Sequence, residues 1–315
     1  MLIPIQPTCW SEHEELKTVV VCSPALLDVP DSETAQDIQW SKPFEYKKAR
    51  ENFDEMVTKM KDVGVEVIDY SDYLPMKDKK LSDQLIHRIF VRDLACTLGQ
   101  TVIPGEPGMS MRRPEYMHAH FLFNRWLTEG TFKIEANNKI DSLECGDILV
   151  LNKNAVIINT GLRTSVSSIE HIKDHIFRAG FSEIGVINLP RRADTMHLDM
   201  NCNIVGNDVM LAKSYLRYFP VHVLTTGDAS YQMMHEFLGR HGVEVIFTNH
   251  INHTVADINF ISLDPETLLI SSDANKKLFK HHPKLQNKKL IECDLTELEK
   301  GGGGIRCMTL PLVRG

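Results

Sequence analysis

The 315-residue chain lacks several features that would assign it to large classes of proteins. No apolar run approaches the roughly 20 residues of a membrane-spanning helix. Its first residues lack the cationic start and apolar core of a signal peptide. The seven cysteines form no CxxC pair, so neither a zinc site nor a disulfide framework is expected. We therefore expect a cytoplasmic protein with reduced thiols, no metal and no cofactor.

Positive charge is also scarce. The net charge is −7 and the pI is near 6.1. The densest basic cluster, residues 77–80, is itself interrupted by Asp78. Nucleic acids and anionic membranes attract basic surfaces, so neither is an expected partner. A hydrophobic content of 43% is enough for a full core in one large domain or two.

What the chain does have is a repeated unit. Asp93, Asp147, Asp199 and Asp257 each precede a β-branched run that is broken by turn residues, and Cys307 stands at the fifth such position. The intervals are 54, 52, 58 and 50 residues (147 − 93, 199 − 147, 257 − 199, 307 − 257). Such runs predict hairpins. A repeat of this length is typical of propeller-like arrays.

Apolar periodicity predicts helices over residues 44–62, 165–179 and 231–240, each followed by glycine and a strand, with a weaker helix near 114–127. The chain ends after the first strand of the fifth unit. The strand, helix and strand that this unit lacks are found at the amino terminus. We therefore predict one α/β domain over residues 1–315, a five-bladed pseudo-symmetric propeller of ββαβ units closed by pairing of the two chain ends. The first residues of all units would then converge.

Two further titratable residues flank these positions: Glu144 precedes Asp147 by three residues, and His197 precedes Asp199 by two. Residues i and i+2 of a strand face the same side, so His197 and Asp199 would both face the centre. Excess carboxylates around a thiol suppress the thiolate, which suggests a cationic substrate. A guanidinium fits, because its planar N–H groups match paired carboxylates.

The same residues suggest a reaction. The delocalised charge of a guanidinium makes its carbon a poor electrophile, so a thiolate such as that of Cys307 is the suitable nucleophile. His197 would protonate the departing nitrogen and then deprotonate a water molecule. Glu144 would orient the imidazole or the guanidinium.

Together the motifs resemble the guanidino-group modifying enzymes, which include arginine deiminase, dimethylarginine dimethylaminohydrolase, agmatine deiminase and the arginine amidinotransferases. The resemblance covers nearly the whole chain and rests on the opening strand at 19–24, Phe90-Val91-Arg92-Asp93, Glu144-Cys145-Gly146-Asp147, His197-Leu198-Asp199 and the glycine-rich Cys307 segment. It implies a five-bladed α/β propeller. It also implies that Cys307 is the nucleophile, His197 the acid–base residue with Glu144 its partner, and that Asp93 and Asp199 hold the guanidinium.

Arg112 and Arg163 lie nineteen residues after Asp93 and Glu144. In deiminase-like members such arginines bind the substrate α-carboxylate. Asp147 either contacts the substrate or holds a turn, with equal weight on both. Asp257 has no chemical neighbour and is expected to be structural.

Three departures from the family pattern matter. Cys145 replaces a usual glycine, and the helical domain of larger arginine deiminases is absent. Gly302 stands where arginine deiminases carry an arginine, which counts against free arginine as substrate. Glutamate at position 144, where amidinotransferases usually have aspartate, favours hydrolysis.

The predicted function is hydrolysis of a substituted guanidine, arginine or an arginine derivative, to a ureido product plus ammonia or an amine. The alternatives are an arginine:acceptor amidinotransferase and a non-catalytic binding propeller. Methylated arginine, arginine, agmatine and a longer conjugate all remain open as substrates. The expected partner is this small guanidino compound, and the family often forms homodimers.

Overall fold

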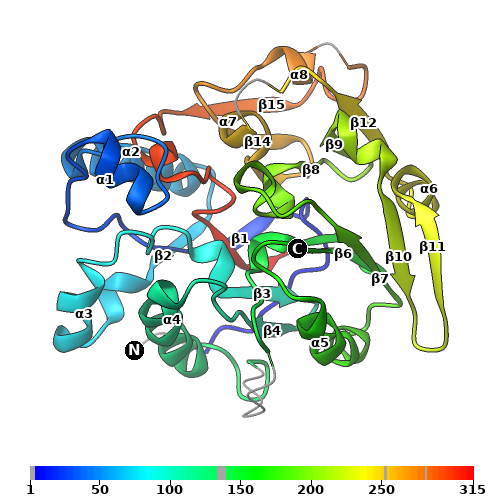
Figure 1. The fold of residues 1–315 in the computed structure, drawn as a ribbon, viewed down its shortest axis with the longest axis horizontal. Helices are drawn as coiled ribbons and strands as arrows, with labels where there is room; N and C mark the ends of the chain where they lie inside the picture. The colour runs from blue at the N-terminus through cyan, green and yellow to red at the C-terminus, as the bar shows by residue number, and fades with distance from the viewer. Residues whose placement is uncertain (1–3, 133–139, 252–253, 281) are drawn as a thin grey trace.

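A mixed α/β fold with several separate sheets is seen in the computed structural model, which describes residues 4–132, 140–251, 254–280 and 282–315 (Figure 1). In this part of the chain sixteen strands form five sheets, and no sheet closes on itself. The sheet orders are β16-β1-β2, β3-β4, β11-β10-β7-β6-β5, β12-β9-β8 and β13-β14-β15.

The strands are short and mostly buried. They are β1 (Leu16–Val21), β2 (Glu66–Asp69), β3 (Ala95–Leu98), β4 (Thr101–Pro104), β5 (Ile148–Asn152), β6 (Ala155–Thr160), β7 (Glu183–Asn188), β8 (Cys202–Val205), β9 (Val209–Lys213), β10 (Pro220–Leu224), β11 (Ala229–Met233), β12 (Glu244–Thr248), β13 (Ile261–Asp264), β14 (Thr267–Ser271), β15 (Lys289–Cys293) and β16 (Leu310–Arg314).

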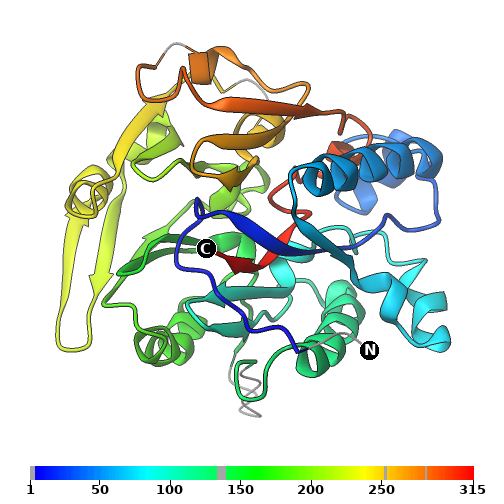
Figure 2. The ribbon, with the colours of Figure 1, turned by 180° about the vertical axis from the view of Figure 1, so that it is seen from behind.

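The α-helices cover the outer edges of these sheets (Figures 1 and 2). They are α1 (Ser32–Asp37), α2 (Tyr46–Asp62), α3 (Met76–Ser82), α4 (Arg113–Trp126), α5 (Val166–Arg178), α6 (Met234–Arg240), α7 (Thr254–Ile258) and α8 (Lys277–Lys280).

Helix α5 shows why the sequence forms these elements. Ile169, Ile172 and Ile176 follow helical spacing and are all buried. The Ser165 hydroxyl caps the helix by accepting a hydrogen bond from the Ser168 backbone N–H. The chain then enters β7, which lies parallel to β6, while β5 and β6 are antiparallel. This hairpin, helix and parallel strand is the predicted ββαβ unit, and the predicted helices over 44–62 and 165–179 are confirmed within two residues.

The two ends of the chain share one sheet. Strand β16 pairs antiparallel with β1, and β1 pairs in parallel with β2. Figure 2 shows the red carboxyl-terminal strand beside the blue β1 near the middle of the molecule. The amino-terminal and carboxyl-terminal segments therefore complete each other's hydrogen bonding, although they are about 290 residues apart (310 − 21 = 289).

Two units depart from the predicted pattern. Residues 229–233, expected to begin a helix near Tyr231, form strand β11 instead, and helix α6 begins only at Met234. Strands β10 and β11 form a hairpin that extends the β5-β6-β7 sheet. The second unit pairs only β3 with β4, and the chain touches β4 again through a parallel bridge at Phe132.

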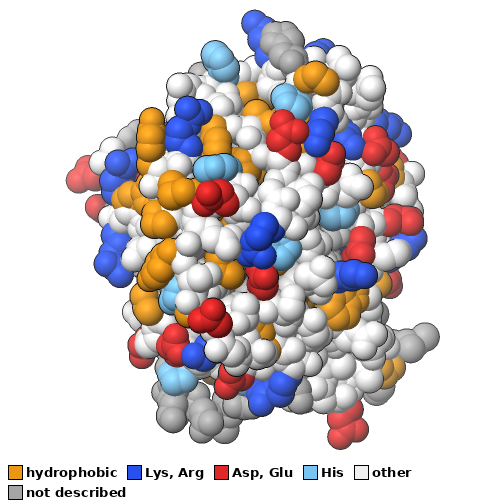
Figure 3. Space-filling model, turned by 90° about the vertical axis from the view of Figure 1, so that its right-hand side faces the viewer, with side chains coloured by type: hydrophobic (Ala, Val, Ile, Leu, Met, Phe, Trp, Pro, Cys, Tyr) orange, Lys and Arg blue, Asp and Glu red, His pale blue; other side chains and the backbone are white. Residues whose placement is uncertain are grey.

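No helix in the described ranges combines the length and the apolar character needed to cross a bilayer. On the face seen in Figure 3, acidic and basic side chains are interspersed with apolar ones. This mixture agrees with a chain whose net charge is modest for its length.

We predict that Leu312→Ala, in β16, lowers the free energy of unfolding by about 2–5 kcal/mol, because its fully buried side chain leaves a cavity between the chain ends. Denaturant unfolding followed by circular dichroism measures the change. Leu81→Ala, at a position 46% exposed, is the control and should cost less than about 1 kcal/mol. Equal losses for the two variants would contradict the importance of the β1–β16 pair.

Candidate active site

Short helical turns bring the repeated positions together at the centre. Asp93, Asp147 and Asp199 lie in the one-turn helices η2 (Val91–Leu94), η4 (Cys145–Asp147) and η6 (Leu198–Met200), each just before a strand. Turn η4 contacts both η2 and η6, and α7 contacts η6. Cys307 occupies a corresponding turn before β16. Residues up to 214 positions apart (307 − 93) thus lie around one cavity.

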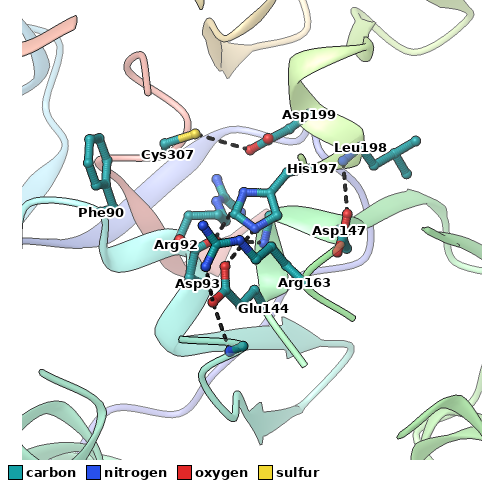
Figure 4. Close-up of polar contacts among 12 residues, drawn as sticks. Phe90, Arg92, Asp93, Glu144, Asp147, Arg163, His197, Leu198, Asp199 and Cys307 are labelled. Carbon is teal, nitrogen blue, oxygen red and sulfur yellow. Dashed lines mark hydrogen bonds and ion pairs between the residues drawn. The ribbon is translucent and has the colours of Figure 1, made fainter. Parts of the chain in front are cut away.

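The local structure around His197 differs from the expectation. His197 has extended backbone angles but Asp199 lies inside η6, so the two are not alternate residues of one strand. In Figure 4, Asp199 points toward Cys307, and the His197 ring points toward Glu144 and Asp93. The prediction that His197 and Asp199 face the same side of a strand is therefore wrong, because a helical turn precedes the hairpin.

The cavity has a volume of about 510 Å³, which suits a small metabolite. Six predicted site residues line it: Cys307, His197, Glu144, Asp93, Arg112 and Arg163. The predicted residues Asp147 and Asp199 are not among the lining residues. The rest of its wall consists largely of apolar and uncharged side chains from distant segments: Gln36, Gln39, Trp40, Ser41, His87, Phe90, Met109, Leu162, Ala193, Met196, Met200 and glycines 301–303.

Cys307 is buried, with 4% of its surface exposed. Its thiol donates to Asp199 Oδ2 at 3.5 Å (Figure 4). Its backbone N–H donates to Asn259 Oδ1 at 2.9 Å. Burial, together with the charges of Asp199 and Asp93, raises the pKa of the thiol well above its usual range, although Arg306 acts in the opposite direction. The resting sulfur is therefore a protonated thiol.

His197 and Glu144 form a buried ion pair. His197 Nε2 lies 2.8 Å from Glu144 Oε2, and His197 Nδ1 lies 3.7 Å from Asp93 Oδ1. Burial alone would lower the pKa of His197, but Asp93, Glu144 and Asp147 outweigh it and raise the pKa to about 10. Burial likewise opposes the charge of Glu144, yet His197 and the nearby arginines lower its pKa to about 2. The imidazole is thus a charged acid at neutral pH.

Asp93 and Asp199 are the two carboxylates whose charges act on the Cys307 thiol. Asp93 Oδ2 accepts from Arg112 Nη1 at 2.7 Å, and its Oδ1 accepts from the Gly146 N–H at 3.2 Å. Asp199 Oδ2 accepts from Arg306 Nη1 at 2.8 Å. Within the described ranges, the buried Asp199 Oδ1 has no hydrogen-bond partner. Asp199 is completely buried and is not among the residues that line the cavity, so it acts on the site through its contact with the Cys307 thiol.

Asp147 is held by hydrogen bonds from neighbouring protein groups. It accepts hydrogen bonds from Asn159 Nδ2 at 2.7 Å, Thr164 Oγ1 at 2.6 Å and the Leu198 N–H at 3.0 Å. It is completely buried, which raises its pKa to about 7. These contacts support the structural role: Asp147 fixes the backbone next to His197. Asp257 is also buried and accepts from the Asn275 N–H at 2.7 Å.

The two predicted carboxylate-binding arginines differ in their partners. Arg112 donates from Nη1 to Asp93, from Nε to Glu115 at 2.9 Å and from Nη2 to the Phe90 carbonyl at 3.0 Å. Arg163 donates from Nη2 to Gln39 Oε1 at 2.9 Å, and its Nη1 is 3.8 Å from Glu144 Oε1. Its buried Nε has no partner among the residues that the structure describes. Arg163 therefore retains a donor for a ligand, whereas Arg112 supports Asp93.

Sequence reasoning missed Arg306 and Glu12. Arg306 is 1% exposed and bridges Asp199 to Glu12, whose Oε1 lies 2.9 Å from Nη2. The same Nη2 donates to the Ile148 carbonyl at 2.7 Å. A charged residue next to Cys307 in an apolar segment was a usable signal for Arg306. No such sequence signal pointed to Glu12, because its partner Arg306 is 294 residues away.

The glycine run before Cys307 allows close packing. A Cβ on Gly303 would lie 2.6 Å from the Phe90 ring and 2.9 Å from Cys307 Cβ, and one on Gly301 would lie 2.8 Å from the same ring. Gly302 has φ +91°, which favours glycine. The run is thus required for the backbone to pass Phe90 at the cavity wall.

Asp93, Glu144 and His197 each place one ligand atom within 4.8 Å of the others, a spacing that a metal ion could use. Arg112 Nη1 already lies 2.7 Å from Asp93 and 3.9 Å from Glu144. A second cation between these groups would be repelled by the arginine.

Comparisons with known proteins identify the family of this chain. A family model described as arginine deiminase matches residues 74–314, well over half of the chain. The Bacillus subtilis protein YkgA, which is uncharacterised, is 22% identical over 309 residues, covering 98% of this chain and 95% of that protein. The arginine deiminase of Borreliella afzelii is 26% identical over 258 residues, which are 74% of this chain. The match covers 62% of that deiminase.

Solved structures show the same fold. A cysteine-to-serine variant of the Pseudomonas aeruginosa dimethylarginine dimethylaminohydrolase, complexed with citrulline, superposes with a TM-score of 0.68 at 17% identity, covering 94% of this chain and 99% of that one. An amidinotransferase of Microseira wollei gives a TM-score of 0.69 at 14% identity, covering 98% and 97%. The fold is that of the guanidino-group modifying proteins. Within this class, the chain belongs to the arginine deiminase family.

The buried His197–Glu144 pair predicts a specific pH dependence. Because the pKa of His197 is raised from 6.5 to about 10, its stabilisation is complete below pH 6.5 and is lost as the pH rises through 10. Between these values, the free energy of unfolding should fall by up to about 1.4 kcal/mol per pH unit. Denaturant unfolding at several pH values measures the slope, and Glu144→Gln should flatten it.

Glu183→Gln is the matched control, since Glu183 Oε2 lies 3.1 Å from His241 Nε2 in a similar pair outside the cavity. It should leave the slope close to that of the wild type. A slope unchanged in Glu144→Gln would contradict the assignment of the charged imidazole.

Proposed function

We propose that this protein hydrolyses a substituted guanidine, arginine or an arginine derivative, to a ureido product plus ammonia or an amine through a covalent Cys307 intermediate. The observation that carries the proposal is the arrangement of Cys307, the His197–Glu144 ion pair and Asp93 at one cavity, with Asp199 in contact with the Cys307 thiol. The family and the neighbouring structures support the same reaction class.

Charge explains why the substrate is a cation. Asp93 and Asp199 both raise the pKa of the Cys307 thiol. A guanidinium bound in the cavity beside Asp93 and the Cys307 thiol would compensate the negative charges that disfavour the thiolate. Substrate binding therefore lowers the thiol pKa, so that the nucleophile forms when its target is present.

The reaction then follows from the charged imidazole. The thiolate electron pair forms an S–C bond to the central guanidinium carbon, and the C–N bond to the departing nitrogen breaks as His197 protonates that nitrogen. His197, now neutral, takes a proton from water while the water oxygen attacks the same carbon. The S–C bond breaks, the thiolate leaves, and the hydroxyl proton of the intermediate passes to solvent as the ureido C=O bond forms. The thiol, which gave its proton to solvent when the substrate bound, is protonated again after the product leaves. The sum is one guanidine plus one water giving one ureido product plus ammonia or an amine.

The other end of the substrate would face Arg163. Its buried Nε lacks a partner within the described ranges, and its guanidinium lines the cavity. A carboxylate is the group that an arginine pairs with best. Arg112 contributes less directly, since its nitrogens already hold Asp93, Glu115 and the Phe90 carbonyl. This arrangement favours an amino-acid substrate.

We also infer that the five sheets are the blades of a pseudo-symmetric propeller. Supporting this, three units begin with a one-turn helix and a hairpin, and the strand-helix-strand that the last unit lacks is supplied by β1, α2 and β2.

The proposal predicts that Cys307→Ser lowers kcat about 10³-fold or more, because a hydroxyl is a far weaker nucleophile here. A ureido-product assay on L-arginine, NG,NG-dimethyl-L-arginine and agmatine measures it. Cys293→Ser, in β15 and outside the cavity, is the control and should stay within a few-fold of the wild type. Turnover surviving in Cys307→Ser, or a covalent adduct on another cysteine, would remove the proposal.

The same assay separates the alternatives. An amidinotransferase, like the Microseira wollei neighbour, would form product only when an amine acceptor is added. A binding protein would bind a guanidine and release no ureido product. Product formation from substrate and water alone is the expected result.

A further inference from the structure

A carboxylate from the start of the chain reaches the centre of the molecule and pairs with the residue before the nucleophile. Glu12 is 6% exposed, and its Oε1 and Oε2 accept from Arg306 Nη2 and Nε at 2.9 and 3.4 Å. It is not among the residues that line the cavity, and the proposed reaction does not use it. Burying a carboxylate is costly, so its place behind the site requires a reason.

Backbone contacts to three sheets hold the segment that carries Glu12. This segment forms a parallel bridge to β16, and the Cys9 N–H donates to the carbonyl of Gly99, between β3 and β4, at 2.8 Å. The Glu12 N–H donates to the Val150 carbonyl at 3.0 Å, and Glu12 Oε1 accepts from the Val150 N–H at 3.3 Å. Figure 2 shows the blue segment crossing the middle of the molecule beside the red carboxyl-terminal strand. The carboxylate therefore has a fixed position.

Glu12 and Asp199 share one cation. Arg306 Nη1 lies 2.8 Å from Asp199 Oδ2, whereas Nη2 and Nε both donate to Glu12. The same Asp199 Oδ2 accepts from the Cys307 thiol at 3.5 Å. A continuous series of polar contacts thus runs from Glu12 through Arg306 and Asp199 to the sulfur, and two carboxylates divide one guanidinium within it.

Negative charge is in excess around the nucleophilic thiol. Burial, Asp199 and Asp93 raise its pKa, while Arg306 lowers it. The ion pair of His197 with Glu144, at the same cavity, carries no net charge. Drawing Arg306 away from Asp199 therefore favours the protonated sulfur.

Glu12 is ionised, so it attracts Arg306 with a full charge. Burial opposes this charge, but Arg306, Arg92 and Arg314 lower the pKa of Glu12 to about 2. The other titratable neighbours are neutral at neutral pH, because burial raises the pKa of the two thiols to about 12 and lowers that of the imidazole to about 4: Cys9, Cys96 and His13.

We propose that Glu12 is a positioning residue for the nucleophile: it holds Arg306 partly away from Asp199 and so keeps the Cys307 thiol protonated until a guanidinium enters the cavity. The amino-terminal segment thereby suppresses the reactive thiolate in the free enzyme. This proposal rests on the proposed function for the role of Cys307. It adds how the charge at the site is set from outside the cavity.

Glu12→Gln tests the proposal, because glutamine keeps the size and an acceptor oxygen but removes the charge. Arg306 would then pair more fully with Asp199, so we expect iodoacetamide to alkylate Cys307 about 3- to 10-fold faster at neutral pH. Peptide mass spectrometry of the Cys307 adduct measures this rate separately from the other cysteines and without turnover. Glu12→Asp, which keeps the charge on a shorter side chain, should give a smaller rise, and it replaces Glu12→Gln if that variant does not fold.

Glu14→Gln is the matched control, since Glu14 lies in the same segment and its Oε2 accepts from the Trp10 N–H at 3.3 Å. Its alkylation rate should stay within about 2-fold of the wild type. The rise in Glu12→Gln should shrink with increasing pH, because alkaline solution ionises the thiol in both proteins. A factor that stays constant up to the pH at which the wild-type thiol is ionised would indicate a loosened structure and overturn the proposal. An unchanged or slower rate, or an equal rise in Glu14→Gln, would also overturn it.

Steady-state kinetics distinguish this proposal from the proposed function. In Glu12→Gln, KM for the guanidine should rise several-fold because the centre carries one negative charge fewer, while kcat should change less than about 3-fold. Faster alkylation in a protein that turns over no guanidine would support the role of Glu12 and overturn the proposed hydrolysis. Turnover with an unchanged alkylation rate would have the opposite meaning.

Discussion

Burying several carboxylates around one thiol is unfavourable unless cations accompany them, and the centre of this protein is built around that constraint. Arg112 pairs with Asp93, His197 with Glu144, and Arg306 with both Asp199 and Glu12. The pairing is nevertheless incomplete, because Asp199 Oδ1 has no hydrogen-bond partner in the described chain. The unfilled acceptor and the suppressed thiolate are two consequences of one deficit of positive charge, and a guanidinium in the cavity would compensate the second.

The backbone makes this concentration of charge possible. One-turn helices at the start of three units deliver their side chains to the centre, while the hairpins that follow remain apolar and buried. The glycines before Cys307 let the last turn pass the Phe90 ring, and Gly146 leaves room for the His197 ring. Any Cβ at Gly146 would lie 2.9 Å from His197 Nδ1. Small residues therefore determine how closely the backbone packs around the His197 ring and Cys307.

Much of this could be predicted from the chain, and the failures have identifiable causes. Helices α2 and α5 carry clear periodicity, so their bounds were found within two residues. The stretch around Tyr231 was assigned to a helix although residues 229–233 pair with β10, because strand pairing is a non-local contact that overrides local propensity. The roles of Asp147 and Arg112 could not be separated from those of other site residues, since spacing does not reveal which atoms are already hydrogen-bonded.

The sequence by itself determined the repeat, the five converging positions, the types of chemical group at each and the resemblance that named the family. These features depend on residue order and local propensity, which can be read directly from the amino-acid sequence. Only the tertiary structure decided that Arg306 and Glu12 support Asp199 and that Arg112 is committed to Asp93. Each of these depends on partners far apart in the chain, because hydrogen bonds and charge pairing depend on distance in space.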